Sequence, residues 1–153
     1  YLTVQLLVPL HADVVVIPHV ISFSYVENRG AAFGLFAENR WVFMIASFVL
    51  IFALLLILKY SNIKHPLFLI SVSLILGGGI GNMIDRIFND GFVVDFLNFS
   101  FIDFPVFNIA DCSIVIGAGL IILSLFKSII DEQKQKSHMS AVSENQDNND
   151  GNI

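Results

Sequence analysis

The chain has 153 residues, of which 56% are hydrophobic and 14% are charged, and its mean hydropathy is +0.77. Soluble domains are about 45–50% apolar and about 25% charged, so this composition excludes an ordinary soluble domain and indicates an integral membrane protein. Much of the net charge of −5 comes from the segment after Ile130, and the near-neutral remainder gives no support for nucleic-acid binding. Cys112 is the single cysteine, so neither an internal disulfide nor a cysteine-based metal site is expected.

The N-terminal part of the chain predicts a small domain outside the membrane. Tyr1–Leu10 (YLTVQLLVPL) is apolar, too short to span a bilayer, and lacks the basic start of a signal peptide. We interpret it as the end of a helix whose beginning is missing. Residues 11–40 contain alternating, β-branched sequence around Pro18 and Gly30, which predicts short strands and a turn in an extracytoplasmic subdomain.

Three apolar runs predict transmembrane helices. Trp41–Leu58 and Leu67–Ile84 contain no charged residue, and each is long enough to cross a hydrocarbon core of about 30 Å. The third run reaches spanning length if its helix covers residues 108–130. Gly77 and Gly81 form a small-xxx-small pair, which predicts that another helix approaches the second span closely.

Basic residues predict the orientation of the chain, because lysine and arginine accumulate in cytoplasmic connections. Lys59 and Lys64 lie between the first two predicted spans, and Lys127, Lys134 and Lys136 follow the third apolar run, Cys112–Phe126. Both places are therefore expected to be cytoplasmic, and residues 10–40 and 85–109 to lie outside. The polar segment 131–153 lacks the apolar residues needed to form a core, so we expect a disordered cytoplasmic tail.

Polar residues gather at the outer end of the predicted spans. Asn82, Asp85 and Arg86 are spaced i, i+3 and i+4 on one helical face. Asn108 and Asp111 are one turn apart at the start of the third span. Each of these has a structural explanation when taken alone, such as pairing at the headgroup level or a charge at a helix N-terminus. Taken together, ionisable groups at membrane depth indicate a functional site.

Three aspartates occur in the stretch VVDFLNFSFIDFPVFNIADCSIVIG, at positions 95, 103 and 111. Asp103 precedes Phe104-Pro105 and is expected to be a solvated loop residue. Asp95 and Asp111 are expected to converge, and two carboxylates in one site share a proton and titrate as a unit. The ionised carboxylate can take a proton from water as it attacks a carbonyl, and the protonated one can polarise that carbonyl and protonate the leaving amine. This chemistry predicts an aspartic peptidase; HExxH and GxSxG motifs are absent from the sequence.

A non-enzymatic protein is the alternative interpretation. A multipass transporter or channel subunit also uses intramembrane carboxylates, to bind ions or protons. Its aspartates would face a water-filled path across the bilayer, whereas a peptidase needs a one-sided cleft.

Four motifs resemble those of lipoprotein signal peptidase, the bacterial type II signal peptidase. In chain order they are VENRGAAF (Val26–Phe33), GGGIGNMIDR (Gly77–Arg86), VVDF (Val93–Phe96) and FPVFNIAD (Phe104–Asp111). The resemblance covers roughly residues 1–130. It implies an all-α polytopic membrane protein with four transmembrane helices and a small extracytoplasmic β-rich cradle, the first helix being missing or truncated in this sequence.

The resemblance also implies roles for individual residues. Asp95 and Asp111 match the catalytic pair, and Asp85 matches a position with a structural role near the site. The residues expected to bind substrate or support the site are Asn28, Gly30, Asn82, Arg86 and Asn108. Neither a metal nor another cofactor is expected.

The implied substrate is a prolipoprotein whose lipobox cysteine carries a diacylglyceryl group, with cleavage just before that cysteine. Membrane lipid is the other expected partner, and nucleic acid is not. The resemblance places the enzyme in the bacterial cytoplasmic (inner) membrane as a multi-pass protein, with its active site at the extracytoplasmic face. We expect it to act as a monomer.

Overall fold

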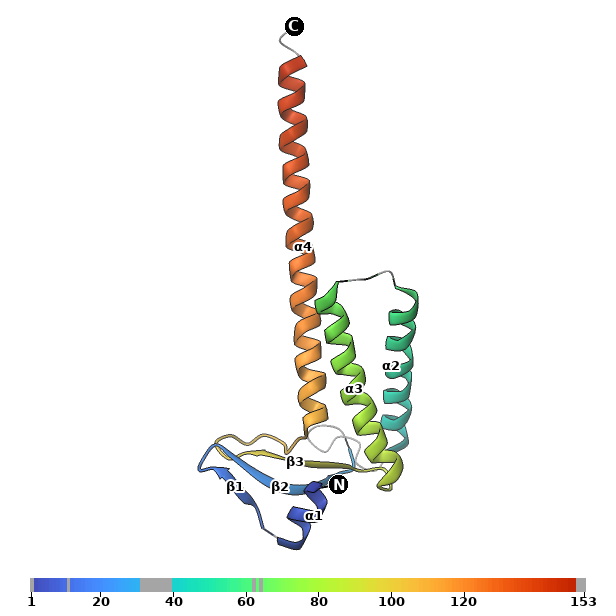
Figure 1. Cartoon of the computed structure of the whole chain (residues 1–153), viewed down its shortest axis with the longest axis vertical. Coiled ribbons are helices and arrows are strands. Elements are labelled where there is room, and N and C mark those ends of the chain that lie inside the picture. Colours follow the sequence, from blue (N-terminus) through green and yellow to red (C-terminus); the bar gives the residue numbers. More distant parts are fainter. Residues whose placement is uncertain (1, 11, 31–39, 62, 64, 151–153) are drawn as a thin grey trace.

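A computed structural model describes residues 2–10, 12–30, 40–61, 63 and 65–150. The elements in chain order are α1 (Leu2–Leu7), a 3-10 turn η1 (Val8–Leu10), β1 (Val14–Ile17), β2 (Ile21–Asn28), α2 (Arg40–Tyr60), α3 (Pro66–Phe88), β3 (Val93–Phe99) and α4 (Ile109–Asp150). Helices α2, α3 and α4 stand side by side, and the small sheet lies across one end of this bundle with α1 beyond it (Figure 1). The sheet end is therefore the end at which α2 and α4 begin and α3 finishes.

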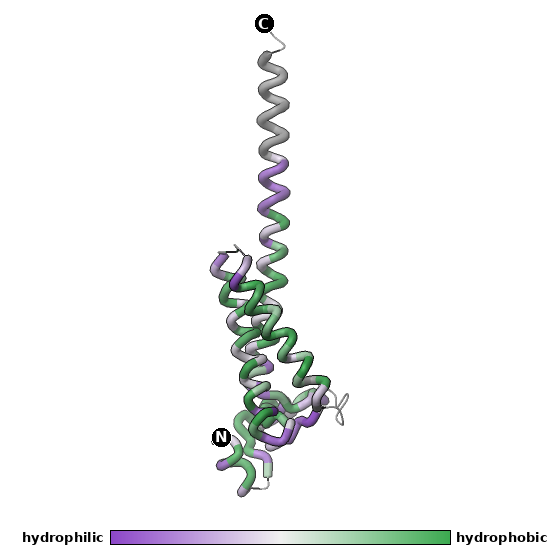
Figure 2. The backbone as a smooth tube through the Cα atoms, turned by 90° about the vertical axis from the view of Figure 1, so that its right-hand side faces the viewer, coloured by the Kyte–Doolittle hydropathy of each residue, from purple (hydrophilic) through white to green (hydrophobic). Residues whose placement is uncertain are grey.

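The three long helices are apolar along the bundle, and α4 becomes polar beyond it (Figure 2). Among the described residues, α3 and the Ile109–Ser137 part of α4 are long and apolar enough to cross a membrane, and Met44–Tyr60 of α2 is a shorter apolar helix. Only 22% and 11% of the most apolar windows of α3 and α4 are buried inside the protein. A core helix of a soluble protein would be mostly buried, so lipid is the environment that suits these side chains.

Helices α2 and α3 correspond to the first two predicted spans, with small shifts at their ends. Helix α3 begins at Pro66, because proline lacks the N–H that the first turn would leave unpaired and its φ angle suits a helix. The predicted span stops at Ile84, but α3 continues to Phe88. Asp85 and Arg86 therefore belong to the last turns of a helix that reaches the sheet.

Glycines bring α3 and α4 into backbone contact. A Cβ atom added at Gly78 would collide with the carbonyl oxygen of Ala110, and one added at Gly117 would lie 2.7 Å from the carbonyl oxygen of Ser71. A Cβ at Gly77 would meet nothing within 4 Å. The prediction of a close helix approach is thus confirmed: a Cβ at Gly81 would lie 3.4 Å from Cβ of Ala110, and the tightest contact is made by Gly78 and not by Gly77.

The sheet has the order β1-β2-β3 with antiparallel pairing throughout. The strands and turn predicted within residues 11–40 are confirmed by β1 and β2; residues 31–39 lie outside the described part. Strand β3 follows α3 through a tight turn in which Asp90 and Gly91 have φ angles of 49° and 91°. Glycine adopts this conformation without steric cost, so the chain reverses and β3 starts beside the end of α3.

The C-terminal segment differs from the prediction. Helix α4 continues through the polar sequence to Asp150, and extends far beyond the other helices (Figure 1), where the sequence predicts a disordered tail from Asp131. Extending an existing helix adds one hydrogen bond for each residue fixed, and Glu, Gln and Lys are good helix formers. Glu132 and Lys136 also form an i, i+4 ion pair at 2.6 Å. These local terms favour helix without a core.

Candidate active site

The start of α4 is capped by a reciprocal pair of hydrogen bonds. The Oδ1 atom of Asn108 accepts the backbone N–H of Asp111 at 3.1 Å, and Asp111 Oδ2 accepts the backbone N–H of Asn108 at 3.1 Å. This arrangement is a capping box, which satisfies two N–H groups that a helix start leaves without intrahelical partners. The two bonds hold Oδ1 of Asn108 and Oδ2 of Asp111 against the backbone. They therefore determine where the other terminal atom of each side chain points.

The capped Asn108 links the two candidate catalytic aspartates. Because its oxygen faces the α4 backbone, its Nδ2 group faces outward and donates to Asp95 Oδ1 at 2.7 Å and to Asn82 Oδ1 at 3.0 Å. Asn82 donates from its own Nδ2 to Asp111 Oδ1 at 2.8 Å. Asp95 and Asp111 thus meet in one hydrogen-bonded network, and Asn108 within it is only 5% exposed.

Asn28 supplies the second hydrogen bond to Asp95. Its Nδ2 donates to Asp95 Oδ2 at 2.8 Å, while its Oδ1 accepts the backbone N–H of Gly30 at 3.0 Å. The strand register explains the contact, because Val26 pairs with Asp95 and Asn28 pairs with Val93, which makes Asn28 and Asp95 diagonal neighbours. Each oxygen of Asp95 therefore accepts an amide N–H whose orientation is fixed by a backbone contact.

The electrostatics of Asp95 suit proton transfer. Its side chain is 1% exposed. Burial raises the pKa of the Asp95 carboxyl to about 6; the charge of Asp111 also raises it, and the hydrogen bonds from Asn28 and Asn108 and the charge of Arg86 lower it. A carboxyl group with a pKa close to neutrality can both give and take a proton under ordinary conditions.

Asp85 and Arg86 join α3 to the segments that carry the site. Arg86 donates from Nη1 to the carbonyl oxygen of Asn82 and from Nη2 to that of Gly30, both at 3.3 Å. Asp85 Oδ2 accepts the backbone N–H of Val94 at 3.1 Å. Arg86 thereby connects α3 with the turn after β2, and Asp85 connects α3 with the start of β3.

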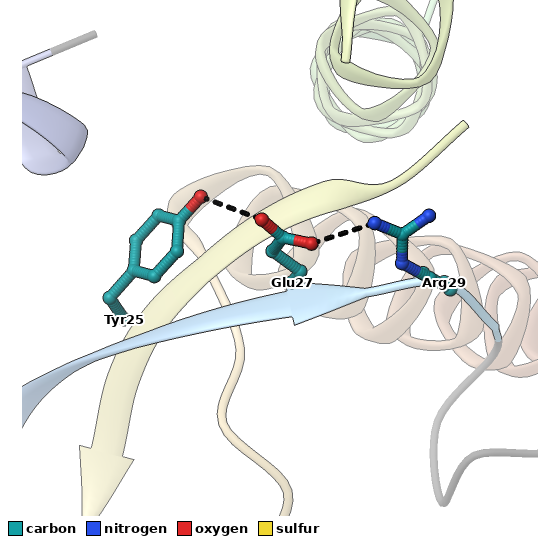
Figure 3. Close-up of polar contacts among 3 residues, drawn as sticks. All are labelled: Tyr25, Glu27 and Arg29. Atoms are coloured by element: carbon teal, nitrogen blue, oxygen red, sulfur yellow. Dashed lines mark hydrogen bonds and ion pairs between the residues drawn. The ribbon is translucent and has the colours of Figure 1, made fainter. Parts of the chain in front are cut away.

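Beside the aspartate network, a row of polar side chains lies along β2. Tyr25 Oη donates to Glu27 Oε1 at 3.4 Å, and Arg29 Nη2 pairs with Glu27 Oε2 at 2.8 Å (Figure 3). The Arg29 guanidinium also lies 5.2 Å from the centre of the Phe92 ring, which adds a cation–π contact. Since Arg29 and Glu27 are 56% and 40% exposed, their ion pair alone contributes little. Together these contacts hold the end of β2, from which Asn28 reaches Asp95.

A cavity of about 240 Å³ lies beside the network, between α2, α3 and α4. Its lining includes the site residues Asn28, Gly30, Asn82, Arg86 and Asp111, and the polar residue Ser47 of α2. The rest of its wall is mostly apolar and includes Leu50, Ile51 and Leu54 of α2. The sequence does not identify this α2 wall, because an apolar residue that faces a cavity cannot be distinguished from one that faces lipid in a uniformly apolar helix.

The structure brings the predicted site residues together. Those that share hydrogen bonds or the cavity wall are Asn28, Gly30, Asn82, Arg86, Asp95, Asn108 and Asp111. Asp103 is exposed in the loop between β3 and α4, as predicted. Asp103 therefore lies apart from Asp95 and Asp111, which share the hydrogen-bonded network.

Known proteins match this chain along most of its length. The family model for signal peptidase (SPase) II matches residues 2–127. A lipoprotein signal peptidase of Symbiobacterium thermophilum is 42% identical over 118 residues, which are 76% of this chain and 77% of the relative. One of Halothermothrix orenii is 46% identical over 112 residues, or 73% and 74% of the two chains. A solved structure described as a bacterial membrane enzyme superposes with a TM-score of 0.73 at 35% identity, covering 77% of this chain and 73% of its own.

The apolar helices, the small sheet at their end and the likeness to a membrane enzyme define a membrane-embedded enzyme of the peptidase class. The chain belongs to the signal peptidase II family. This membership favours the enzymatic interpretation over a transporter or channel subunit.

Proposed function

We propose that the protein is an aspartic endopeptidase that removes signal peptides from diacylglyceryl-modified prolipoproteins, cleaving before the lipidated cysteine. Family membership and the lipoprotein signal peptidases among the relatives support this function. The observation that carries the mechanism is the network in which Asn108 contacts both Asp95 and Asp111. One of these aspartates, Asp111, also lines the cavity between the helices.

In the proposed mechanism Asp95 and Asp111 share one proton. The ionised carboxylate removes a proton from water as the water attacks the scissile carbonyl, while the protonated carboxyl polarises that carbonyl. The proton then passes to the leaving amine, and the pair returns to its starting state. Asn28, Asn82 and Asn108 hold the carboxylates in place through amide hydrogen bonds, so little reorganisation is needed when water reacts.

The location of the network fits a lipidated substrate. A signal peptide that lies in the bilayer as a helix, followed by a cysteine with acyl chains, presents its scissile bond near the membrane boundary. The network lies where α3 and α4 meet the sheet, and the apolar cavity wall extends from there between the helices. The sheet then covers the bond from outside and limits the access of bulk water.

The lipid requirement gives a direct test of the function. The reconstituted protein should cleave a precursor whose lipobox cysteine carries diacylglycerol, because the acyl chains place the bond at the depth of the aspartates. The same precursor with an unmodified cysteine should stay intact. Product size measured by mass spectrometry identifies the bond. Equal cleavage of both precursors would contradict the lipid requirement, and cleavage of neither would contradict the proposed function.

We also propose that α2, α3 and α4 all span the cytoplasmic membrane, with the sheet and the aspartates at the extracytoplasmic face. Lys59 at the end of α2 and Lys127, which follows the apolar run of α4, lie away from the sheet, which supports this orientation. The family pattern adds a further span that precedes the extracytoplasmic subdomain.

Cysteine labelling in intact cells tests this orientation. In a Cys112→Ser background, a cysteine at Ser100 should react with a membrane-impermeant maleimide, because Ser100 is exposed beside the sheet. A cysteine at Ser61, after α2, should react only once the membrane is permeabilised. The reverse pattern would place the aspartates at the cytoplasmic face and overturn the orientation.

A further inference from the structure

Ser47 is a polar side chain on the α2 wall of the cavity. The other α2 residues that line the cavity, Leu50, Ile51 and Leu54, are aliphatic. The serine is half-buried and lies in the half of α2 that is closer to the sheet. It shares the cavity with Asn82 and Asp111, which belong to the aspartate network. It therefore lines the same cavity as Asp111, one of the two candidate catalytic aspartates, from a different helix.

The packing of α2 against α3 sets the depth of Ser47. A Cβ atom added at Gly79 of α3 would lie 3.5 Å from Cγ1 of Ile51, so the two helices are in contact at this level. Ser47 precedes Ile51 by about one turn, and Asn82 follows Gly79 by about one turn. Because α2 and α3 run in opposite directions, both steps lead toward the sheet. Ser47 and Asn82 therefore lie at similar depth on facing walls of the cavity.

The hydroxyl of Ser47 has no hydrogen-bond partner among the described residues. Three other serines in the helices donate to the carbonyl four residues earlier: Ser71 to Leu67 at 2.6 Å, Ser113 to Ile109 at 3.0 Å and Ser128 to Ser124 at 3.0 Å. Such a back-bond is the usual way in which a helical serine satisfies its hydroxyl in an apolar environment. Ser47 is half-buried, and its hydroxyl keeps a donor and an acceptor available at the cavity wall.

The substrate brings the complementary polar groups to this depth. A peptide bond must leave the helical conformation to be attacked, and unwinding a helix in the membrane frees backbone N–H and C=O groups that lipid cannot satisfy. If the scissile bond lies at the aspartates, the residues just before it face the apolar part of the cavity wall. A hydroxyl on the wall opposite the aspartates can accept or donate the missing hydrogen bond.

We propose that Ser47 is a substrate-binding residue that hydrogen-bonds the unwound backbone of the signal peptide on the N-terminal side of the scissile bond. This inference rests on the proposed peptidase function and deepens it. It assigns to α2 the wall that holds the unwound substrate backbone, and this wall faces α3 and α4, to which Asn82 and Asp111 belong. Ser47 contributes to ground-state and transition-state binding alike, so its loss affects KM more than kcat.

The test compares steady-state kinetics of Ser47→Ala, Ser47→Thr and Ser73→Ala on a lipidated precursor. Ser47→Ala should raise KM about five- to tenfold, as expected for one lost hydrogen bond, and leave kcat within about twofold. Ser47→Thr keeps the hydroxyl and should stay near the wild-type KM. Ser73 is exposed on α3, outside the cavity lining, so Ser73→Ala is the matched control and should leave both constants unchanged.

The outcomes separate this inference from the proposed function. Absence of cleavage by the wild-type protein would contradict the function itself. Wild-type cleavage together with an unchanged KM in Ser47→Ala would overturn only the role of Ser47. A fall in kcat without a change in KM would also overturn it, because the hydroxyl would then act on the chemical step and not on substrate binding.

Discussion

Replacement of either candidate catalytic aspartate by asparagine should nearly abolish cleavage. Asp95→Asn and Asp111→Asn keep the size of each side chain, but an amide can neither take a proton from water nor share one with its partner. We expect kcat to fall by a factor on the order of 10⁴ or more, as when other enzymes lose a member of a unit that acts together. Lipidated precursor is the substrate, and product formation over hours is the measurement.

Stability measurements show whether such a loss is chemical or structural. Burial raises the pKa of Asp95 to about 6 from an ordinary value of 3.8, so between these pH values the folded protein holds a proton that the unfolded chain releases. The free energy of unfolding should therefore fall as the pH rises through this interval. Asp95→Asn removes this dependence, so its free energy of unfolding should change less than that of the wild type over the same interval.

Asp103→Asn is the control for the aspartate variants, because Asp103 lies on the same stretch of chain but is exposed in the loop. It should cleave at close to the wild-type rate. An inactive Asp103 variant, or normal turnover by either Asp95→Asn or Asp111→Asn, would contradict the assignment of the catalytic pair.

Replacement of Asn108 by serine should separate its two roles. Serine is as good an N-cap residue as asparagine, so Asn108→Ser keeps the cap of α4. It removes the Nδ2 group that donates to Asp95 and Asn82. The carboxylates then lose their common partner, and we expect kcat to fall about 100-fold, as for a misplacement of about 1 Å in a reacting group.

The pH dependence of the Asn108 variant distinguishes positioning from a general structural effect. The hydrogen bond from Asn108 lowers the pKa of Asp95, so its removal should raise that pKa and shift the Asp95 limb of the rate profile to higher pH. Asn98→Ser is the matched control, because Asn98 also lies in the site-bearing part of the chain but donates to Ser24 at 3.3 Å. A wild-type rate and pH profile in Asn108→Ser would exclude the proposed positioning role.

Much of this protein follows from local sequence. Long apolar runs determine the membrane helices, because a bilayer requires continuous hydrophobic length and intrasegment hydrogen bonds. The β-branched alternation before Asn28 similarly indicates strands. The candidate site residues can be found from composition too, since carboxylates, asparagines and an arginine at the edge of apolar spans have few structural uses. Asp103 could be separated from the other aspartates by its Phe-Pro neighbour.

Contacts between residues far apart in the chain could not be predicted from the local sequence. Asn28 reaches Asp95 because β2 pairs with β3 in one register, and a shift of one residue would turn Asn28 to the other face. Gly78 makes the tightest glycine contact with Ala110 of α4 because of how the two helices are rotated, which a mostly apolar sequence leaves undetermined. The same ambiguity concealed the α2 wall of the cavity, including Ser47.

The sequence by itself determined the membrane class, the family and the set of polar residues, because hydrophobic length and motif order are properties of the chain. The tertiary structure decided how these residues act on one another. It showed that the cap of α4 and the link between Asp95 and Asp111 are made by one side chain, Asn108. It also showed α4 as a helix beyond Asp131. The Asn108 link depends on the geometry between elements, and the extension of α4 depends on propagation from an existing helix. Local composition predicts neither of them.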